Sequence, residues 1–135
     1  MKTNNEELDV ITLELIDNAM GSIMAQMTLT VIYAASTAAS VELSDFAAGL
    51  CDAEGNVLAN GLSEPGHLLG LSTSISSIYK FWSLDEMKPG DVFICNDPYE
   101  GGTHLPDVTV VRPIFFKGEL IAFSGMVAHQ LDIGG

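Results

Sequence analysis

Two apolar runs in the C-terminal third of the chain, 108–116 and 119–128, are joined only by Lys117-Gly118. A two-residue link that contains glycine is typical of a tight β-hairpin, because glycine readily adopts the positive φ angles that such turns require. Pairing in a hairpin is antiparallel, so the end of the second run returns beside the start of the first. The sequence therefore predicts an antiparallel sheet with residue 129 beside residues 104 and 107.

The rest of the chain predicts helices and shorter strands around this hairpin. Apolar residues recur at helical spacing after Asp9, which is an N-cap candidate. Methionines at this spacing favour a core or subunit face over a cofactor site, because methionine fills irregular apolar gaps. The expected elements are a helix from Asp9 through Val31, a helix extension or loop at 34–44, a hairpin of 46–51 and 57–59, a loop at 61–66, a helix over 68–82, a short buried strand at 92–95, and the hairpin of 108–116 and 119–128.

This order predicts an α+β fold, with an N-terminal helix, β-hairpins and a second helix packed on a mostly antiparallel sheet. Residues 1–7 are expected to form a polar tail, and residues 8–135 a metal-binding portion of a larger domain. The 135-residue chain stops at Gly134-Gly135, just after an expected strand and inside a candidate site. We therefore expect a further polypeptide to supply the rest of the domain.

Composition excludes several classes of partner. Lysine and arginine number 5 against 18 acidic residues, a net charge of −13, which disfavours binding to nucleic acids or anionic membranes. No stretch is long and apolar enough to predict a membrane span, and the polar start does not predict a signal peptide. Cys51 and Cys95 lack metal-site spacing and are expected to be small buried hydrophobic residues. Together with the polar start, this favours a reducing cytoplasm. Hydrophobic residues nevertheless make up 47% of the chain, so part of the surface is expected to pack against a partner.

The run from Asn96 to Asp107 carries the clearest chemical signal, because His104 and Asp107 follow the Gly101-Gly102 turn. The predicted hairpin adds His129, and two imidazoles with a carboxylate are typical ligands of a catalytic metal with open coordination positions. The alternative for His104 and Asp107 is a turn with a hydrogen-bonded histidine. The alternative for His129 is an ordinary strand-end side chain.

Three more residues have alternative functional and structural interpretations. Asp45, before the first hairpin, could be a fourth ligand or a cap. His67 could bind substrate or metal, or simply begin the second helix. Asp97 could orient a ligand histidine or hold a turn together. The sequence contains no phosphate-binding loop, dinucleotide fingerprint or nucleophile elbow, so it offers no recognisable ATP site.

These segments together resemble the hydantoinase B/oxoprolinase family, which also includes the α-type subunits of acetone and acetophenone carboxylases. The matching segments are 11–16, 45–46, 50–55, 66–68, 89–91, 96–107 and 128–135. Two positions depart from the family pattern: Gln130 replaces a second histidine, and the uncharged 38–41 with Glu42 replaces a basic stretch. Family members are several times longer, so the chain resembles their N-terminal part.

The resemblance implies a metal held by Asp45, His104, Asp107 and His129. It also implies that His67 faces the substrate. Asp97 and Asp132 would contact and orient the metal-binding side chains without binding the metal themselves. Zinc, manganese and iron all suit nitrogen and oxygen donors. ATP would be bound by an A-type partner subunit.

The implied function is a metal-binding component of an ATP-dependent hydrolase of cyclic amides of the hydantoin, oxoproline or lactam type. The Thr103–Asp107 form favours the hydantoinase branch. One alternative is a component of an ATP-dependent ketone carboxylase of the acetone or acetophenone type. The other is a non-catalytic assembly subunit.

Overall fold

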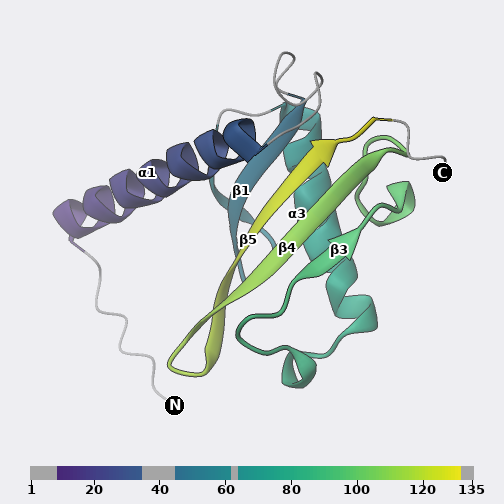
Figure 1. Cartoon of the computed structure of the whole chain (residues 1–135). Helices are drawn as coiled ribbons and strands as arrows, with labels where there is room; N and C mark the ends of the chain where they lie inside the picture. Colours follow the sequence, from purple (N-terminus) through teal and green to yellow (C-terminus); the bar gives the residue numbers. More distant parts are fainter. Residues whose placement is uncertain (1–8, 35–44, 62–63, 132–135) are drawn as a thin grey trace.

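The structure is a computed structural model that describes residues 9–34, 45–61 and 64–131. Its centre is a five-stranded sheet in the order β2-β1-β5-β4-β3, in which every neighbouring pair is antiparallel. The elements are α1 (Val10–Ala34), β1 (Phe46–Asp52), β2 (Val57–Asn60), α3 (Pro65–Phe81), η1 (Leu84–Glu86), β3 (Phe93–Cys95), η2 (Pro98–Glu100), β4 (Asp107–Phe116) and β5 (Glu119–His129). Figure 1 shows α3 behind the sheet and α1 running out from the side of β1. The predicted α+β class is confirmed.

The β4–β5 hairpin forms as predicted and sets the register of the sheet. Lys117 and Gly118 have φ angles of 51° and 86°, and two positive φ angles in a two-residue turn match the twist of the flanking strands. Asp107 pairs directly with His129 at the far end of the same hairpin. The sequence prediction that the hairpin returns residue 129 to residue 107 is therefore confirmed.

The core lies between the sheet and α3, which runs behind the sheet in Figure 1. From α3, Leu71, Ile75 and Ile78 enter a cluster with Cys51, Met87, Val111, Phe123 and Val127. Gly125 allows this close packing, because a Cβ atom built there would lie 3.3 Å from Leu71 Cγ and closer still to one of its methyl groups. Tyr79 and Trp82, expected on the same face, are 36% and 50% exposed and lie at its margin.

The second helix begins at Pro65, whereas the sequence analysis placed residues 61–66 in a loop and began the helix at 68. Glu64 is the N-cap, and its carboxylate accepts the backbone N–H groups of Gly66 and His67 at 2.6 and 3.3 Å. Proline suits the first helical position because it has no N–H to leave unpaired. This correction puts His67 in the first turn of α3.

The first helix begins at its predicted cap. Asp9 accepts the Thr12 N–H at 3.0 Å and the Thr12 hydroxyl at 2.6 Å. Of its described residues, only Met24 and Thr28 are buried. No helix in the described part of the chain is long and apolar enough to cross a membrane.

The strand predicted at 92–95 is β3, but it is not buried as expected. It is an edge strand that pairs only with β4 in the described sheet, and Ile94 is 71% exposed. The predicted tail at 1–7 and most of the predicted extension or loop at 34–44 lie outside the described residues. The short helices η1 and η2 were not predicted.

Candidate metal centre

Three strand ends bring candidate ligands to one end of the sheet. Asp107 begins β4, His129 ends β5, and Asp45 directly precedes β1. Phe46 pairs with Ala128, and the His129 N–H donates to the Asp45 carbonyl oxygen at 3.1 Å. Strand pairing therefore brings His129 and Asp45, which are 22 and 62 positions from Asp107 in the sequence, to the same end of the sheet as Asp107.

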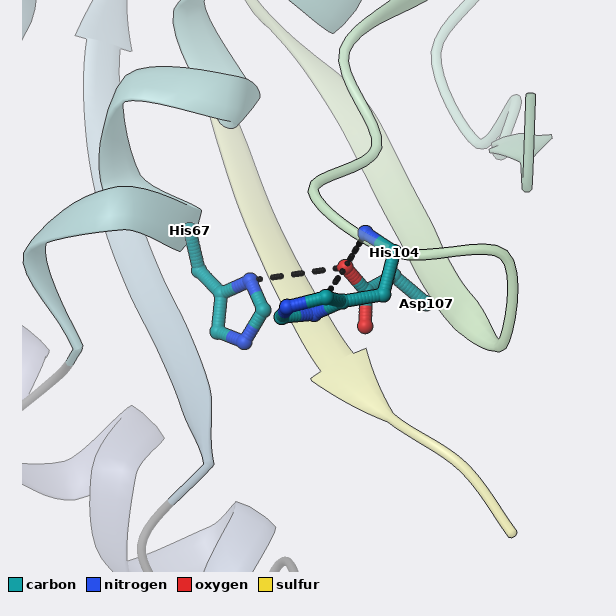
Figure 2. A group of neighbouring side chains, drawn as sticks. All are labelled: His67, His104 and Asp107. Atoms are coloured by element: carbon teal, nitrogen blue, oxygen red, sulfur yellow. Dashed lines mark hydrogen bonds and ion pairs between the residues drawn. The ribbon is translucent and has the colours of Figure 1, made fainter. Parts of the chain in front are cut away.

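Two more imidazoles approach from outside the strands. His67 comes from the first turn of α3, and His104 from the connection between η2 and β4. Figure 2 shows dashed lines that join both His67 and His104 to the Asp107 carboxylate. The ring centroids of His67 and His104 lie 5.8 Å apart, and those of His104 and His129 lie 5.3 Å apart, both with edge-on geometry. The His104 ring is thus in edge-on contact with both of the other histidines of the chain.

Asp107 is the centre of the group. Its Oδ1 lies 2.8 Å from His129 Nδ1, and its Oδ2 lies 3.4 Å from His104 Nδ1 and 3.6 Å from His67 Nδ1. The backbone N–H groups of Thr103 and His104 donate to Oδ2 at 3.0 and 2.6 Å. The carboxylate is fully buried and held by several groups before any ligand arrives.

The same contacts keep Asp107 ionised. Burial by itself raises the pKa of this carboxyl group, because it disfavours the charged form. The hydrogen bonds from the His104 N–H and from His129, together with the nearby His67 and His104 rings, outweigh burial and lower the pKa of Asp107 below its ordinary value. A buried carboxylate that stays charged is suited to binding a cation.

His67 is buried with 1% exposure, and both of its ring nitrogens have partners. Nε2 lies 2.7 Å from Asp45 Oδ1, and Nδ1 lies 3.1 Å from the Thr103 hydroxyl. Because a carboxylate oxygen only accepts, the arrangement fits a tautomer that donates from Nε2 to Asp45 and accepts at Nδ1. Asp45 therefore orients His67, and its other oxygen lies 3.9 Å from His129 Nδ1.

The donor set fits a divalent metal ion. One donor atom from each of His67, His104 and Asp107 lies within 4.8 Å of the others. Ligands bound tetrahedrally at about 2.1 Å from one ion lie roughly 3.4 Å apart, close to the His104–Asp107 and His67–Asp107 separations. His104 has 54% side-chain exposure, so the group is open on this side to an incoming molecule.

The glycine-rich loop is held against α3 by close backbone contact. Gly101 has a φ angle of 118°, and a Cβ atom there would lie 2.5 Å from the Gly70 carbonyl oxygen and 2.6 Å from the Ser74 nitrogen. Only a residue without a side chain permits this approach. The contact fixes the loop carrying His104 relative to the helix carrying His67.

Two other residues named from the sequence, Asp97 and Gln130, make hydrogen bonds to backbone atoms two residues away. Asp97 caps η2 and accepts the Tyr99 N–H at 2.9 Å, which matches the turn-holding alternative of the sequence analysis. Gln130, at the position of the family's second histidine, donates through its amide to the Ala128 carbonyl at 3.3 Å. Asp132 lies outside the described residues.

Sequence reasoning missed how deeply His67 is buried and that Thr103 contacts it. The only local signal was the run Glu64-Pro65-Gly66 immediately before His67. An acidic residue followed by proline is typical of a helix start, and a helix start here aims His67 at the end of the sheet.

Comparison with known proteins identifies relatives of nearly the whole chain. Residues 9–135 match the family model described as hydantoinase B/oxoprolinase. A 5-oxoprolinase from Saccharomyces cerevisiae is 43% identical over 131 residues, which cover 96% of this chain and 10% of the relative. The caprolactamase subunit beta of Pseudomonas jessenii is 31% identical over 128 residues, covering 95% of this chain and 22% of the relative. The chain thus spans only a small part of these relatives.

Two solved structures share the fold. The ATP-dependent caprolactamase from Pseudomonas jessenii superimposes with a TM-score of 0.77 and 27% identity, over 96% of this chain and 22% of the other. A nucleotide-free acetone carboxylase superimposes with a TM-score of 0.84 over 93% of this chain and 17% of the other. Its identity of 23% supports similarity of fold alone.

Proposed function

Because this chain belongs to the hydantoinase B/oxoprolinase family, we propose that it is the metal-binding part of an ATP-dependent hydrolase of cyclic amides. The family relatives named 5-oxoprolinase and caprolactamase support this substrate class, since both names denote amides closed into a ring. The observation that carries the proposal is the convergence of three imidazoles and two carboxylates at one open end of the sheet.

In this proposal, His104, Asp107, His129 and Asp45 hold one divalent ion, either zinc, manganese or iron. When bound, the ion would polarise a carbonyl oxygen or lower the pKa of a bound water. Asp107 is fixed for this task by two backbone N–H groups. His67 positions Asp45 through its Nε2 and lies within reach of the same ion through its Nδ1.

The remaining chemistry belongs to partners. We propose that an A-type subunit binds ATP and phosphorylates a substrate oxygen, and that a further polypeptide supplies the rest of the B-type domain. The exposed side of His104 is where the substrate would meet the ligand group. We also propose that Asp132 orients the metal-binding side chains without binding the ion itself, whereas Asp97 caps η2. Two free cysteines are consistent with assembly in the cytoplasm.

The test combines metal content with turnover in the assembled complex. His104→Ala and His129→Ala are compared with Asp85→Asn, an exposed acidic residue of η1. Elemental analysis measures the metal per chain, and phosphate release with ring opening of 5-oxoproline or caprolactam measures turnover.

The proposal expects both histidine variants to lose metal and turnover while the control keeps both. Metal that survives both histidine substitutions would remove these residues from the ligand set. A metal-free wild type whose turnover survives them would favour the assembly subunit. ATP-dependent carboxylation of a ketone, without amide cleavage, would favour the carboxylase alternative.

A further inference from the structure

Helix α1 carries apolar side chains on more than one side but is largely uncovered. Met24 is buried, and Leu15, nine residues or roughly two and a half turns away, lies on the opposite side of the helix. Leu15 is nevertheless 65% exposed, and Leu29 and Ile11 on a neighbouring side are 50% and 71% exposed. Several large apolar side chains exposed on different sides of one helix indicate that further protein packs against it.

The face of the sheet away from α3 carries a second uncovered apolar surface. Side chains alternate between the two faces of a strand, and Cys51, Val111 and Phe123 point toward α3. Their neighbours Val110 and Met126, which pair across β4 and β5, therefore point the other way and are partly exposed. In Figure 1 no described helix crosses this front face of β4 and β5.

The two surfaces meet in one hollow of about 730 Å³. Ile23 and Met27 of α1 form one wall, and Leu50, Ile114 and Ile121 of the sheet lie opposite. Arg112 is the single charged residue among those that line it. The hollow and the exposed sides of α1 together form one apolar docking surface.

We propose that this docking surface, made of α1 and the open face of β4 and β5, seats the remaining part of the hydantoinase B polypeptide. The inference rests on the proposed function in one respect, that a further polypeptide completes the B-type domain. Its support is the length of the relatives: the matched region is 10% of the yeast 5-oxoprolinase and 22% of the caprolactamase subunit. Those proteins therefore carry this region together with a much larger mass of chain.

A second copy of this chain is the less suitable occupant. Each copy carries a net charge of −13, so pairing would bring two strongly acidic chains together. The single charged residue that lines the hollow is Arg112. An acidic group on the incoming segment would pair with Arg112, whereas the same surface of a second copy would present another Arg112. The expected occupant is thus an apolar segment with an acidic residue placed opposite Arg112.

Complementation tests the proposal directly. The probe is the yeast 5-oxoprolinase chain from which the region matched to this protein has been deleted. Binding of the 135-residue chain to this probe is measured by calorimetry, with and without a metal chelator. Ile23→Asp and Ile121→Asp alter the docking surface at positions 48% and 50% exposed, so the isolated chain should fold unchanged. Leu69→Asp, at a 74% exposed position on α3, is the matched control.

The proposal predicts that the wild type and Leu69→Asp bind equally, and that the two docking-surface variants bind at least about tenfold more weakly. A charge in an apolar interface costs more than the 1.4 kcal/mol that corresponds to this factor. Circular dichroism and metal content confirm that each variant is folded. Binding that is absent in the wild type, or unchanged in both variants, overturns the proposal. So does a homodimer in light scattering that the same variants dissociate. Binding that persists in chelator while metal is lost separates this inference from the metal chemistry.

Discussion

Replacement of Gly101 by alanine should destabilise the protein far more than replacement of an equally strained glycine elsewhere. Gly101 and Gly90 have similar φ angles, 118° and 100°. A side chain at such an angle costs about 1–2 kcal/mol. At Gly90 nothing lies within 4 Å of the added Cβ, whereas at Gly101 the Gly70 carbonyl oxygen and the Ser74 nitrogen lie at 2.5 and 2.6 Å.

The backbone contact adds a second cost at Gly101 alone. Inserting a methyl group into a closely packed site costs roughly 1–3 kcal/mol, because the neighbouring backbone must move. Gly101→Ala should therefore lower the free energy of unfolding by roughly 2–5 kcal/mol, and Gly90→Ala by about 1–2 kcal/mol. The displaced loop also carries His104 away from His67, so metal affinity should fall in Gly101→Ala and stay unchanged in Gly90→Ala.

Urea unfolding followed by circular dichroism measures both free energies, and titration with zinc measures both affinities. Equal destabilisation by the two substitutions would refute the argument that α3 and the glycine-rich loop are held together by this contact. Unchanged zinc affinity in a destabilised Gly101→Ala would separate the contact from the metal group.

Three further substitutions test the core, the helix start and a buried thiol. Leu71→Ala should cost about 2–5 kcal/mol of unfolding free energy, against less than about 0.5 for the exposed Leu69→Ala, in the same urea assay. Glu64→Ala removes the cap of α3 and should cost about 1 kcal/mol; no loss would mean that the cap hydrogen bonds contribute nothing. Burial, aided by the Asp52 charge, raises the pKa of the Cys51 thiol from 9.0 to about 11. The folded state thus holds its proton more tightly, so stability should fall by roughly 2–3 kcal/mol between pH 9 and 11. A pH titration of the unfolding free energy that shows the same fall in Cys51→Val would contradict this.

Much of the fold could be predicted because its signals are local. The Lys117-Gly118 turn fixed the hairpin register, and hence the pairing of Asp107 with His129. Asp9 marked the start of α1 by its side-chain hydrogen bonds. Capping and turn chemistry depend on residues a few positions apart, so a sequence displays them directly.

The parts that could not be predicted depend on distant contacts. The burial of His67 follows from how α3 lies across the sheet, and no local pattern encodes that placement. The exposure of Ile94 follows from its position on an edge strand, which depends on the order of all five strands. The Thr103 contact to His67 joins residues 36 positions apart.

The location of a bound ion tests the central claim most directly. Crystals of the metal-loaded complex, measured at the absorption edge of the metal found by elemental analysis, would place it in an anomalous difference map. The account predicts one peak at about 2.0–2.2 Å from donor atoms of Asp45, His104, Asp107 and His129. A peak elsewhere on the chain, or fully loaded metal with these imidazoles turned away from it, would contradict the account.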